Sequence, residues 1–200
     1  MRILVVGGTG TIGAAVVQAL TGSDTEVISV SRSSEPAVDI TDTTSISAMY
    51  EAVGTVDAIV STTGAAPFVA TSEATPEQFA AGFADKLGGQ INLTLLGLPH
   101  LRDGGSITLI TGILAQHPVK NSVIAGTVNG GIEAFAVSAA TDLPRGIRIN
   151  VVSPNVIEEA LPSYGSAFPG FHPVPAAQAA QAFVRSVHGV ETGQVFRVWR

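Results

Sequence analysis

Three glycines stand where a chain could turn sharply around a phosphate group. Gly7, Gly10 and Gly13 lie three residues apart in VGGTGTIG, directly after the apolar run ILVV. Glycine lets a backbone turn tightly and approach a ligand closely, and the amino terminus of a following helix attracts negative charge. A strand, a glycine turn and a helix in this order are typical of a site for the pyrophosphate of a dinucleotide. A glycine-rich turn that serves only packing is the alternative.

A basic residue follows the second apolar run, EVISV at 26–30. Proteins that bind NAD usually carry an acidic residue about 20 positions beyond the glycines, where it accepts hydrogen bonds from the adenosine ribose. Here the chain reads VSRSS, so Arg32 can pair with a 2′-phosphate, and Ser31 and Ser33 offer hydroxyl groups nearby. We therefore expect NADP(H) to be favoured over NAD(H). An arginine solvated on a surface turn is the alternative.

The order of the segments predicts how these residues are positioned. Short β-branched runs alternate with longer stretches that fit helices, which is typical of an α/β fold with a parallel sheet between two helical layers. The predicted strands are 3–6, 26–30, 57–61, 106–111, 147–152 and 194–199, with a short extra strand at 37–39. The predicted helices are 11–21, 43–53, 76–101, 120–143 and 176–188.

The boundaries of two helices carry recognisable signals. Thr75 can cap a helix that begins at Pro76, and Pro144 with Gly146 can end the helix before the strand at 147–152. The stretch 154–175 is rich in Pro, Gly and Ser, so we interpret it as a lid-like loop over one edge of the sheet.

Composition excludes several classes of function. The net charge is −6 without long runs of like charge, which argues against a nucleic-acid-binding surface. The chain has no Cys and four scattered His, so no metal site is expected. No apolar run reaches the roughly 18 residues of a membrane span, and the amino-terminal run fits a strand better than a signal peptide. We therefore expect a cytoplasmic protein without membrane partners.

These features together resemble the short-chain dehydrogenase/reductase family, over nearly the whole chain. The resemblance rests on VVGGTGTIG at 5–13, VDITD at 38–42, STTGAA at 61–66, GQINL at 89–93, LPRGIRINVVSP at 143–154 and TGQVFRVW at 192–199. It implies one Rossmann-type, doubly wound domain over residues 1–200, with a mostly parallel sheet of about seven strands and helices on both faces.

The resemblance also implies which residues contact the cofactor. They are Gly7, Thr9, Gly10, Thr11, Ile12 and Gly13 in the turn, Ser31, Arg32, Ser33, Asp39 and Ile40 on the adenosine side, and Thr62, Thr63, Gly64, Asn129, Pro154 and Val156 further along.

The family's usual catalytic groups are missing. Family members place a Ser after the central strand and a Tyr-x-x-x-Lys on the next helix, whereas SITLITGILA and AGTVN put Gly112, Ala125 and Asn129 at these positions. Asn92 matches the helix asparagine of the family. A side chain that protonates the alkoxide left by hydride transfer contributes about 10²–10⁴-fold to the rate. Ala125 cannot do this, so the usual mechanism cannot operate.

Four side chains are candidates to replace the missing groups. Asn129 can hydrogen-bond a ribose hydroxyl, and Thr111 can replace the Ser as an orienting hydroxyl or merely support the local backbone. His117 lies after the strand at 106–111 and carries an imidazole that can transfer a proton, although a surface histidine is the alternative. Tyr164 can bring a phenol from the lid, or simply pack against its neighbours.

Two functions remain open at this stage. The first is an NADP(H)-dependent oxidoreductase of the short-chain type that acts on an unknown small carbonyl or alcohol through a non-standard active site. The second is a catalytically inactive NADP(H)-binding or redox-sensing protein. Small residues along 126–140 also predict a homo-oligomer, a dimer or tetramer, although contacts within the chain can explain some of them.

Overall fold

The computed structural model describes residues 1–164 and 166–200, together with the backbone at Gly165. Six strands form one sheet in the order β2-β1-β3-β4-β5-β6, and all five pairings are parallel. The strands are β1 (Arg2–Val6), β2 (Glu26–Val30), β3 (Val56–Ser61), β4 (Leu101–Ile110), β5 (Arg148–Pro154) and β6 (Val195–Val198). The α/β fold with a parallel sheet is therefore confirmed.

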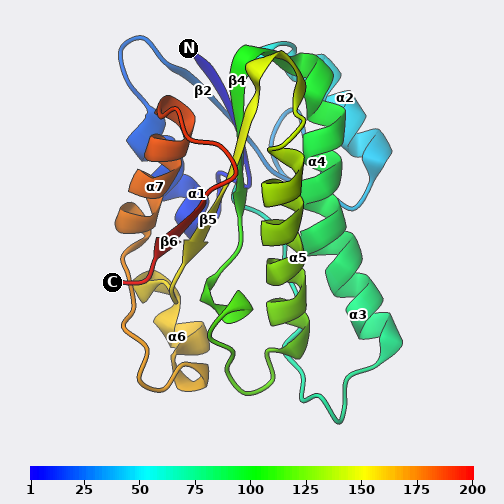
Figure 1. The fold of residues 1–200 in the computed structure, drawn as a ribbon, viewed down its shortest axis with the longest axis vertical. Helices are drawn as coiled ribbons and strands as arrows, with labels where there is room; N and C mark the ends of the chain where they lie inside the picture. Colours follow the sequence, from blue (N-terminus) through cyan, green and yellow to red (C-terminus); the bar gives the residue numbers. More distant parts are fainter.

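Alternate residues of the central strands enter two separate cores. Ile3 and Val5 of β1 pack with α1 (Thr11–Leu20) and α7 (Ala176–His188). Leu4 and Val6 pack on the opposite face, with α2 (Thr43–Val53), α4 (Gly89–Gly97) and α5 (Val123–Ala139). Successive side chains of a strand point to opposite faces, so continuous apolar runs bury both faces of the sheet. Figure 1 shows the two helical layers on either side of it.

The predicted seventh strand at 37–39 is wrong. This segment joins the sheet through a single bridge between Ser31 and Ala37, and the N–H of Val38 donates to the Ser31 carbonyl at 2.9 Å. The pairing stops at Asp39, because its N–H donates to the Ser45 hydroxyl instead of to a strand. The sheet consequently has six strands and not about seven.

The predicted helix 76–101 is divided into four helical segments, the last of which is a 3₁₀ turn at Leu98–His100, and Leu101 already belongs to β4. It begins with α3 (Pro76–Gly82), capped by Thr75 in a reciprocal box with Gln78. A π-helical segment, Phe83–Gly88, follows before α4. A π-helical turn holds more residues than an α-helical turn, so it changes which side chains face the sheet, and such turns are frequent at functional sites.

The stretch 154–175 lies at the carboxyl ends of the strands. It contains the short helix α6 (Leu161–Tyr164), and a bridge between Ile157 and Val174 closes its base. Figure 1 shows α6 near the same end of the molecule as α3. No helix in the described part of the chain is both long and apolar enough to cross a membrane.

Candidate functional site

Two adjoining cavities open at the carboxyl ends of the strands. The first has a volume of about 460 Å³ and lies beyond β1, β2 and β3. Most of the predicted cofactor residues line it: Gly7, Thr9, Gly10, Ser31, Arg32, Asp39, Ile40, Thr62, Thr63 and Gly64. Thr41, Ala65 and Asp85, which the sequence did not single out, line it as well. We call this space the dinucleotide cavity.

The glycine turn has the geometry that a pyrophosphate requires. Gly7 has a φ of 88°, and the Gly10 N–H donates to its carbonyl at 3.0 Å. A Cβ atom on Gly13 would lie 2.1 Å from the Gly7 oxygen, so Gly13 allows α1 to start directly behind the turn. In the described residues no side chain caps the amino terminus of α1. Its free N–H groups therefore fit an anionic ligand.

Charged groups, Arg32 and Asp39, line the dinucleotide cavity beyond the end of β2. Arg32 is exposed and forms no ion pair with any described residue. Asp39 accepts hydrogen bonds from the N–H and the hydroxyl of Thr41, at 2.9 and 2.8 Å. These bonds, and to a lesser degree the charge of Arg32, lower the pKa of Asp39. The site therefore offers a free guanidinium and an ionised carboxylate side by side.

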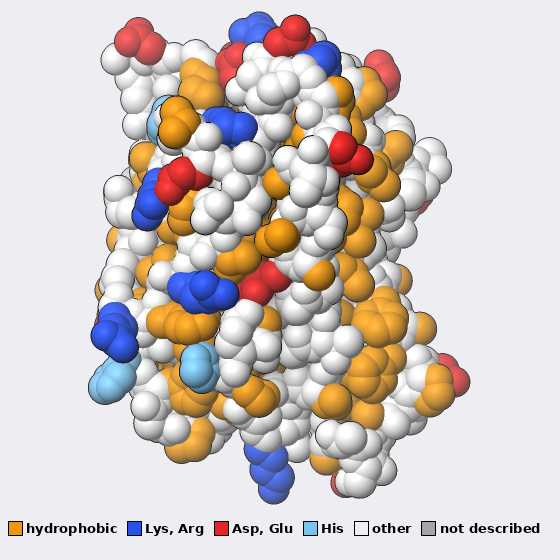
Figure 2. Space-filling model, viewed as in Figure 1, with side chains coloured by type: hydrophobic (Ala, Val, Ile, Leu, Met, Phe, Trp, Pro, Cys, Tyr) orange, Lys and Arg blue, Asp and Glu red, His pale blue; other side chains and the backbone are white. Residues whose placement is uncertain are grey.

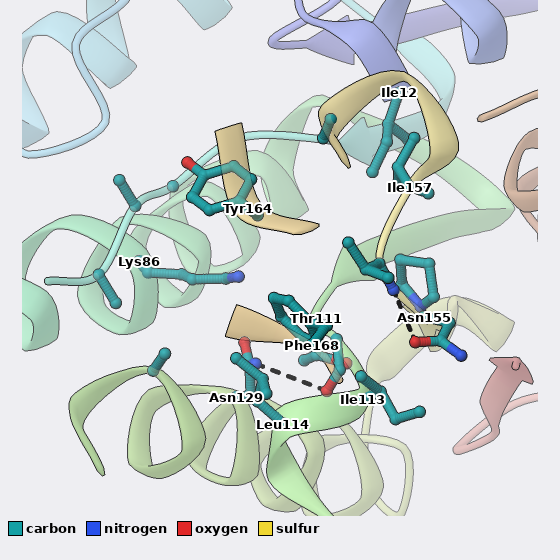
Figure 3. A pocket seen from close by; sticks show the side chains of 18 of the residues that line it. Ile12, Lys86, Thr111, Ile113, Leu114, Asn129, Asn155, Ile157, Tyr164 and Phe168 are labelled. Carbon is teal, nitrogen blue, oxygen red and sulfur yellow. Dashed lines mark hydrogen bonds between the residues drawn. The ribbon is translucent and has the colours of Figure 1, made fainter. Parts of the chain in front are cut away.

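The second cavity is larger and mainly apolar. It has a volume of about 490 Å³ and shares Gly64 and Ala65 with the dinucleotide cavity. Its apolar walls include Ile12, Phe68, Ile113, Leu114, Ile157 and Phe168. Of the predicted residues, Ile12, Gly64, Thr111, Asn129, Pro154, Val156 and Tyr164 line it (Figure 3). We call it the apolar cavity.

The positions at which the resemblance led us to expect the family's Ser, Tyr and Lys do face the apolar cavity. Gly112, Ala125 and Asn129 all line it, so a Ser, a Tyr and a Lys at these positions would reach the same space. The Asn129 amide nitrogen donates to the Gly112 carbonyl at 3.5 Å, while its Oδ1 is buried without a partner among the described residues. This oxygen can accept a hydrogen bond from a bound hydroxyl group, as a nicotinamide ribose would provide.

Thr111 and Tyr164 reach the apolar cavity with different freedom. The buried Thr111 hydroxyl donates to Glu133 Oε1 of α5 at 3.2 Å. Tyr164 is 51% exposed, and its ring lies 6.4 Å from that of Phe68. Figure 3 shows its hydroxyl pointing away from Thr111 and Asn129.

Several predicted residues lie outside both cavities. His117 is exposed and packs edge-on against the Trp199 ring, with ring centres 5.1 Å apart, and it lines neither cavity. Asn92 lies on α4 and also lines neither one. The same holds for Thr11, Gly13 and Ser33. The structure therefore does not bring His117 and Asn92 to the cavity that Asn129 and Thr111 line.

The charged residue of the apolar cavity is one that the sequence did not reveal. Lys86 lies in the π-helical segment and is half-buried, and Figure 3 shows its ammonium pointing into the cavity. Burial lowers the pKa of Lys86 to about 8, although the charge of Asp85 partly opposes this shift. Its only sequence signal is that the chain has just one other lysine, Lys120.

Backbone packing holds Lys86 at the junction of the two cavities. Gly64 has a φ of 107°, and a Cβ atom on it would lie 2.9 Å from the Cα of Lys86. The Ala65 N–H donates to Asp85 Oδ1 at 3.3 Å. The chain after β3 therefore crosses directly over the π-helical segment. Among the described residues, no three His, Cys, Asp or Glu side chains form a group that could hold a metal ion.

A parallel sheet, a glycine turn and two joined cavities of this kind define the class of dinucleotide-binding α/β proteins. The chain belongs to the short-chain dehydrogenase/reductase family. The model of a family described as enoyl-(acyl carrier protein) reductase matches residues 9–196.

Individual relatives agree with this assignment. An uncharacterized oxidoreductase of Methylorubrum extorquens is 30% identical over 144 residues, which cover 72% of this chain and 57% of that protein. The chain thus spans little more than half the length of that relative. A crystal structure of a Listeria innocua protein is 51% identical with a TM-score of 0.97, and the match covers 100% of both chains. A small-chain dehydrogenase in complex with NADPH is 29% identical with a TM-score of 0.88, covering 99% of this chain and 96% of the other.

Proposed function

We propose that this protein is an NADP(H)-dependent oxidoreductase that interconverts a small carbonyl compound and its alcohol. The observation that carries the proposal is the junction of the two cavities at Gly64 and Ala65. A dinucleotide that extends from the glycine turn past this junction would present its nicotinamide to the apolar cavity. A protein that only holds a dinucleotide needs no second chamber beside it.

The residues present fit this cofactor. The uncapped start of α1 and the turn at Gly7 and Gly10 would hold the pyrophosphate, and Asn129 Oδ1 would accept from a ribose hydroxyl. When bound, the reduced nicotinamide supplies the hydride that converts a carbonyl group to an alcohol.

Arg32 supports a preference for the phosphorylated cofactor. Its unpaired guanidinium can form charge-assisted hydrogen bonds with a 2′-phosphate, which are typically stronger than bonds between neutral groups. The similar small-chain dehydrogenase that was solved with NADPH agrees with this choice.

The walls of the apolar cavity favour a substrate with an apolar body. Phe68, Ile113 and Phe168 offer mostly hydrocarbon surface, and Lys86 is the charged side chain among the described residues that line the cavity. Burial of apolar substrate surface against such walls contributes roughly 25 cal/mol per Å². A hydrophobic aldehyde or ketone therefore fits this chamber better than a polyol or a phosphorylated sugar.

Steady oxidation of NADPH in the presence of a panel of carbonyl compounds tests the proposal. We expect turnover with apolar aldehydes or ketones, and the reverse reaction with the matching alcohols and NADP⁺. Binding of NADPH without turnover of any panel member would favour the alternative, an inactive cofactor-binding or redox-sensing protein. The specific observation behind that alternative is that Gly112 and Ala125 give the cavity no hydroxyl group at the family positions.

A further inference from the structure

We infer that Lys86 is the catalytic acid of this site, which protonates the substrate oxygen during reduction and accepts the proton during oxidation. The inference rests on the proposed function and names a residue for its missing step. The Lys86 ammonium would take the role of the family's Tyr. It comes from the π-helical segment and not from α5, and it reaches the same cavity as Ala125.

Two other polar side chains of the apolar cavity, Thr111 and Asn155, are engaged elsewhere. The Thr111 hydroxyl has one proton and donates it to Glu133. Asn155 uses both amide protons for the carbonyls of His172 and Trp199, and its Oδ1 accepts from the Val156 N–H. These groups support the walls of the cavity and cannot release a proton to a substrate.

Lys86 has a position and a chemistry suited to proton transfer, and Figure 3 shows the Tyr164 hydroxyl pointing away from Thr111 and Asn129. Its ammonium points into the cavity that Asn129 and Ala125 also line, and it forms no salt bridge with any residue in 1–164 and 166–200. Because the pKa of Lys86 is lowered to about 8, the group holds its proton at neutral pH and can still release it readily.

The proton and electron count of the step is complete. A hydride supplied by NADPH, which would be oxidised to NADP⁺ as a C–H bond of its nicotinamide breaks, would form a new C–H bond at the carbonyl carbon and move the π electron pair of the C=O bond to the oxygen. The oxygen takes one proton from the Lys86 ammonium, which leaves a neutral amine and an alcohol. Water then returns a proton to the amine. In the oxidation direction the neutral amine accepts the hydroxyl proton as the hydride leaves.

Few other titratable groups face Lys86. Asp85 precedes it in the same π-helical segment, and Tyr164 approaches the cavity from α6. Glu133 of α5 lies behind Thr111, where it accepts from Thr111 and from Gln116. If the rate changes with pH, variants of Lys86 and of Tyr164 are therefore needed to show which of the two groups causes the change.

Three substitutions separate charge from proton transfer. Lys86→Met removes both, whereas Lys86→Arg keeps a positive charge that stays protonated throughout the accessible pH range. Lys120→Met is the matched control, because Lys120 is exposed and lines neither cavity. We expect Lys86→Met to slow carbonyl reduction by about 10²-fold or more, and Lys120→Met to leave the rate unchanged.

The pH profile gives a second readout. Wild-type reduction should fall as the pH rises through about 8, because the acid must be protonated, and oxidation should rise over the same range. Lys86→Arg should lose this step and should still bind NADPH. Tyr164→Phe should keep the step.

NMR of protein labelled with ¹³C at lysine Cε supplies a readout without turnover. Only Lys86 and Lys120 give signals, and Lys120→Arg assigns them. We expect the Lys86 signal to titrate near pH 8 in the protein without cofactor. A Lys86 midpoint near the usual value of about 10.4 would contradict the inference.

The failures of the two proposals are distinguishable. If wild-type protein reduces carbonyls with NADPH and Lys86→Met keeps the rate and the pH step, the inference fails and the proposed function stands. Loss of the step in Tyr164→Phe would assign the acid to Tyr164 and also overturn the inference. If NADPH supports no turnover in the wild type, the proposed function fails and takes the inference with it.

Discussion

Gly64 lies directly over Lys86: a Cβ atom built on Gly64 would come within 2.9 Å of the Lys86 Cα and of its Cγ. This packing joins the loop after β3 to the π-helical segment Phe83–Gly88. Because Gly64 lines both cavities, the contact fixes the boundary between the dinucleotide cavity and the Lys86 side chain.

Gly64→Ala should therefore harm both stability and the site. A non-glycine residue at a φ of 107° costs about 1–3 kcal/mol, and the new methyl group has no room against Lys86. We expect a lower free energy of unfolding in denaturant and weaker NADPH binding. Gly54→Ala is the matched control, because Gly54 also has a positive φ and open space around it in the described structure. Equal effects of the two substitutions would show that the Lys86 contact is unimportant.

Gln90 fixes the end of β4, from which Thr111 and Gly112 follow. The Ile110 N–H donates to Gln90 Oε1 at 2.8 Å, and Gln90 Nε2 donates to the Ile110 carbonyl at 2.9 Å. Gln90→Leu would leave both buried backbone groups without partners, at a cost of about 2–4 kcal/mol in the free energy of unfolding. The exposed Gln181→Leu should change stability by no more than about 0.5 kcal/mol. Indistinguishable denaturant midpoints would contradict the role assigned to Gln90.

Lys86 should destabilise the fold at neutral pH. Its pKa falls from 10.5 to about 8 on folding, so the unfolded chain holds the proton more tightly. Wild-type stability should consequently rise with pH between about 8 and 10.5, and the full penalty applies below about 8.

Lys86→Met removes this penalty, so it should raise the free energy of unfolding at pH 7 by about 1–3 kcal/mol. The gain should shrink as the pH approaches 10.5. Denaturant unfolding at several pH values measures it, with the exposed Lys120→Met as a control that should show no such trend. A gain that does not vary with pH would mean that packing, and not charge, explains the change.

Assembly into a dimer or tetramer remains a prediction. Contacts within the chain explain some of the small residues of α5, because a Cβ atom on Gly131 would lie 3.1 Å from Leu87. Leu95 of α4 and Val137 of α5 are nevertheless 55% and 48% exposed. Figure 2 shows a band of hydrophobic side chains along the side that α3 and α4 form.

We expect sedimentation at micromolar concentration to show a species larger than the 20.3 kDa chain. Leu95→Glu or Val137→Glu should dissociate it, because a charge in an apolar interface is costly. A 20 kDa species in the wild type would overturn this prediction.

The arrangement of elements could be predicted because local signals agreed with it. Apolar β-branched runs marked all six strands, and Thr75 with Pro76 marked the start of α3. The prediction of an extra strand at 37–39 failed because three residues are too few to show a strand pattern. They do not reveal that the Asp39 N–H donates to the Ser45 hydroxyl and not to a neighbouring strand.

The composition of the site was less accessible to sequence reasoning. The predicted cofactor residues follow strand ends, where the carboxyl edge of a parallel sheet gathers them, so the sequence could place Gly7, Arg32 and Gly64 around one cavity. Lys86 could not, because the helix 76–101 gave no sign of the π-helical segment that sets its orientation. The loop geometry that turns His117 onto Trp199 left no local signal either.

The measurement that tests the central claim most directly is an equilibrium titration of the purified protein with NADPH and with NADH, followed by nicotinamide fluorescence. We predict that NADPH binds at least about tenfold more tightly than NADH. Arg32→Ala should abolish this difference. Arg102→Ala should not, because its partner Asp57 lies near the start of β3, whereas both cavities open at the carboxyl ends of the strands. Failure of the wild-type protein to bind either nucleotide would contradict the account.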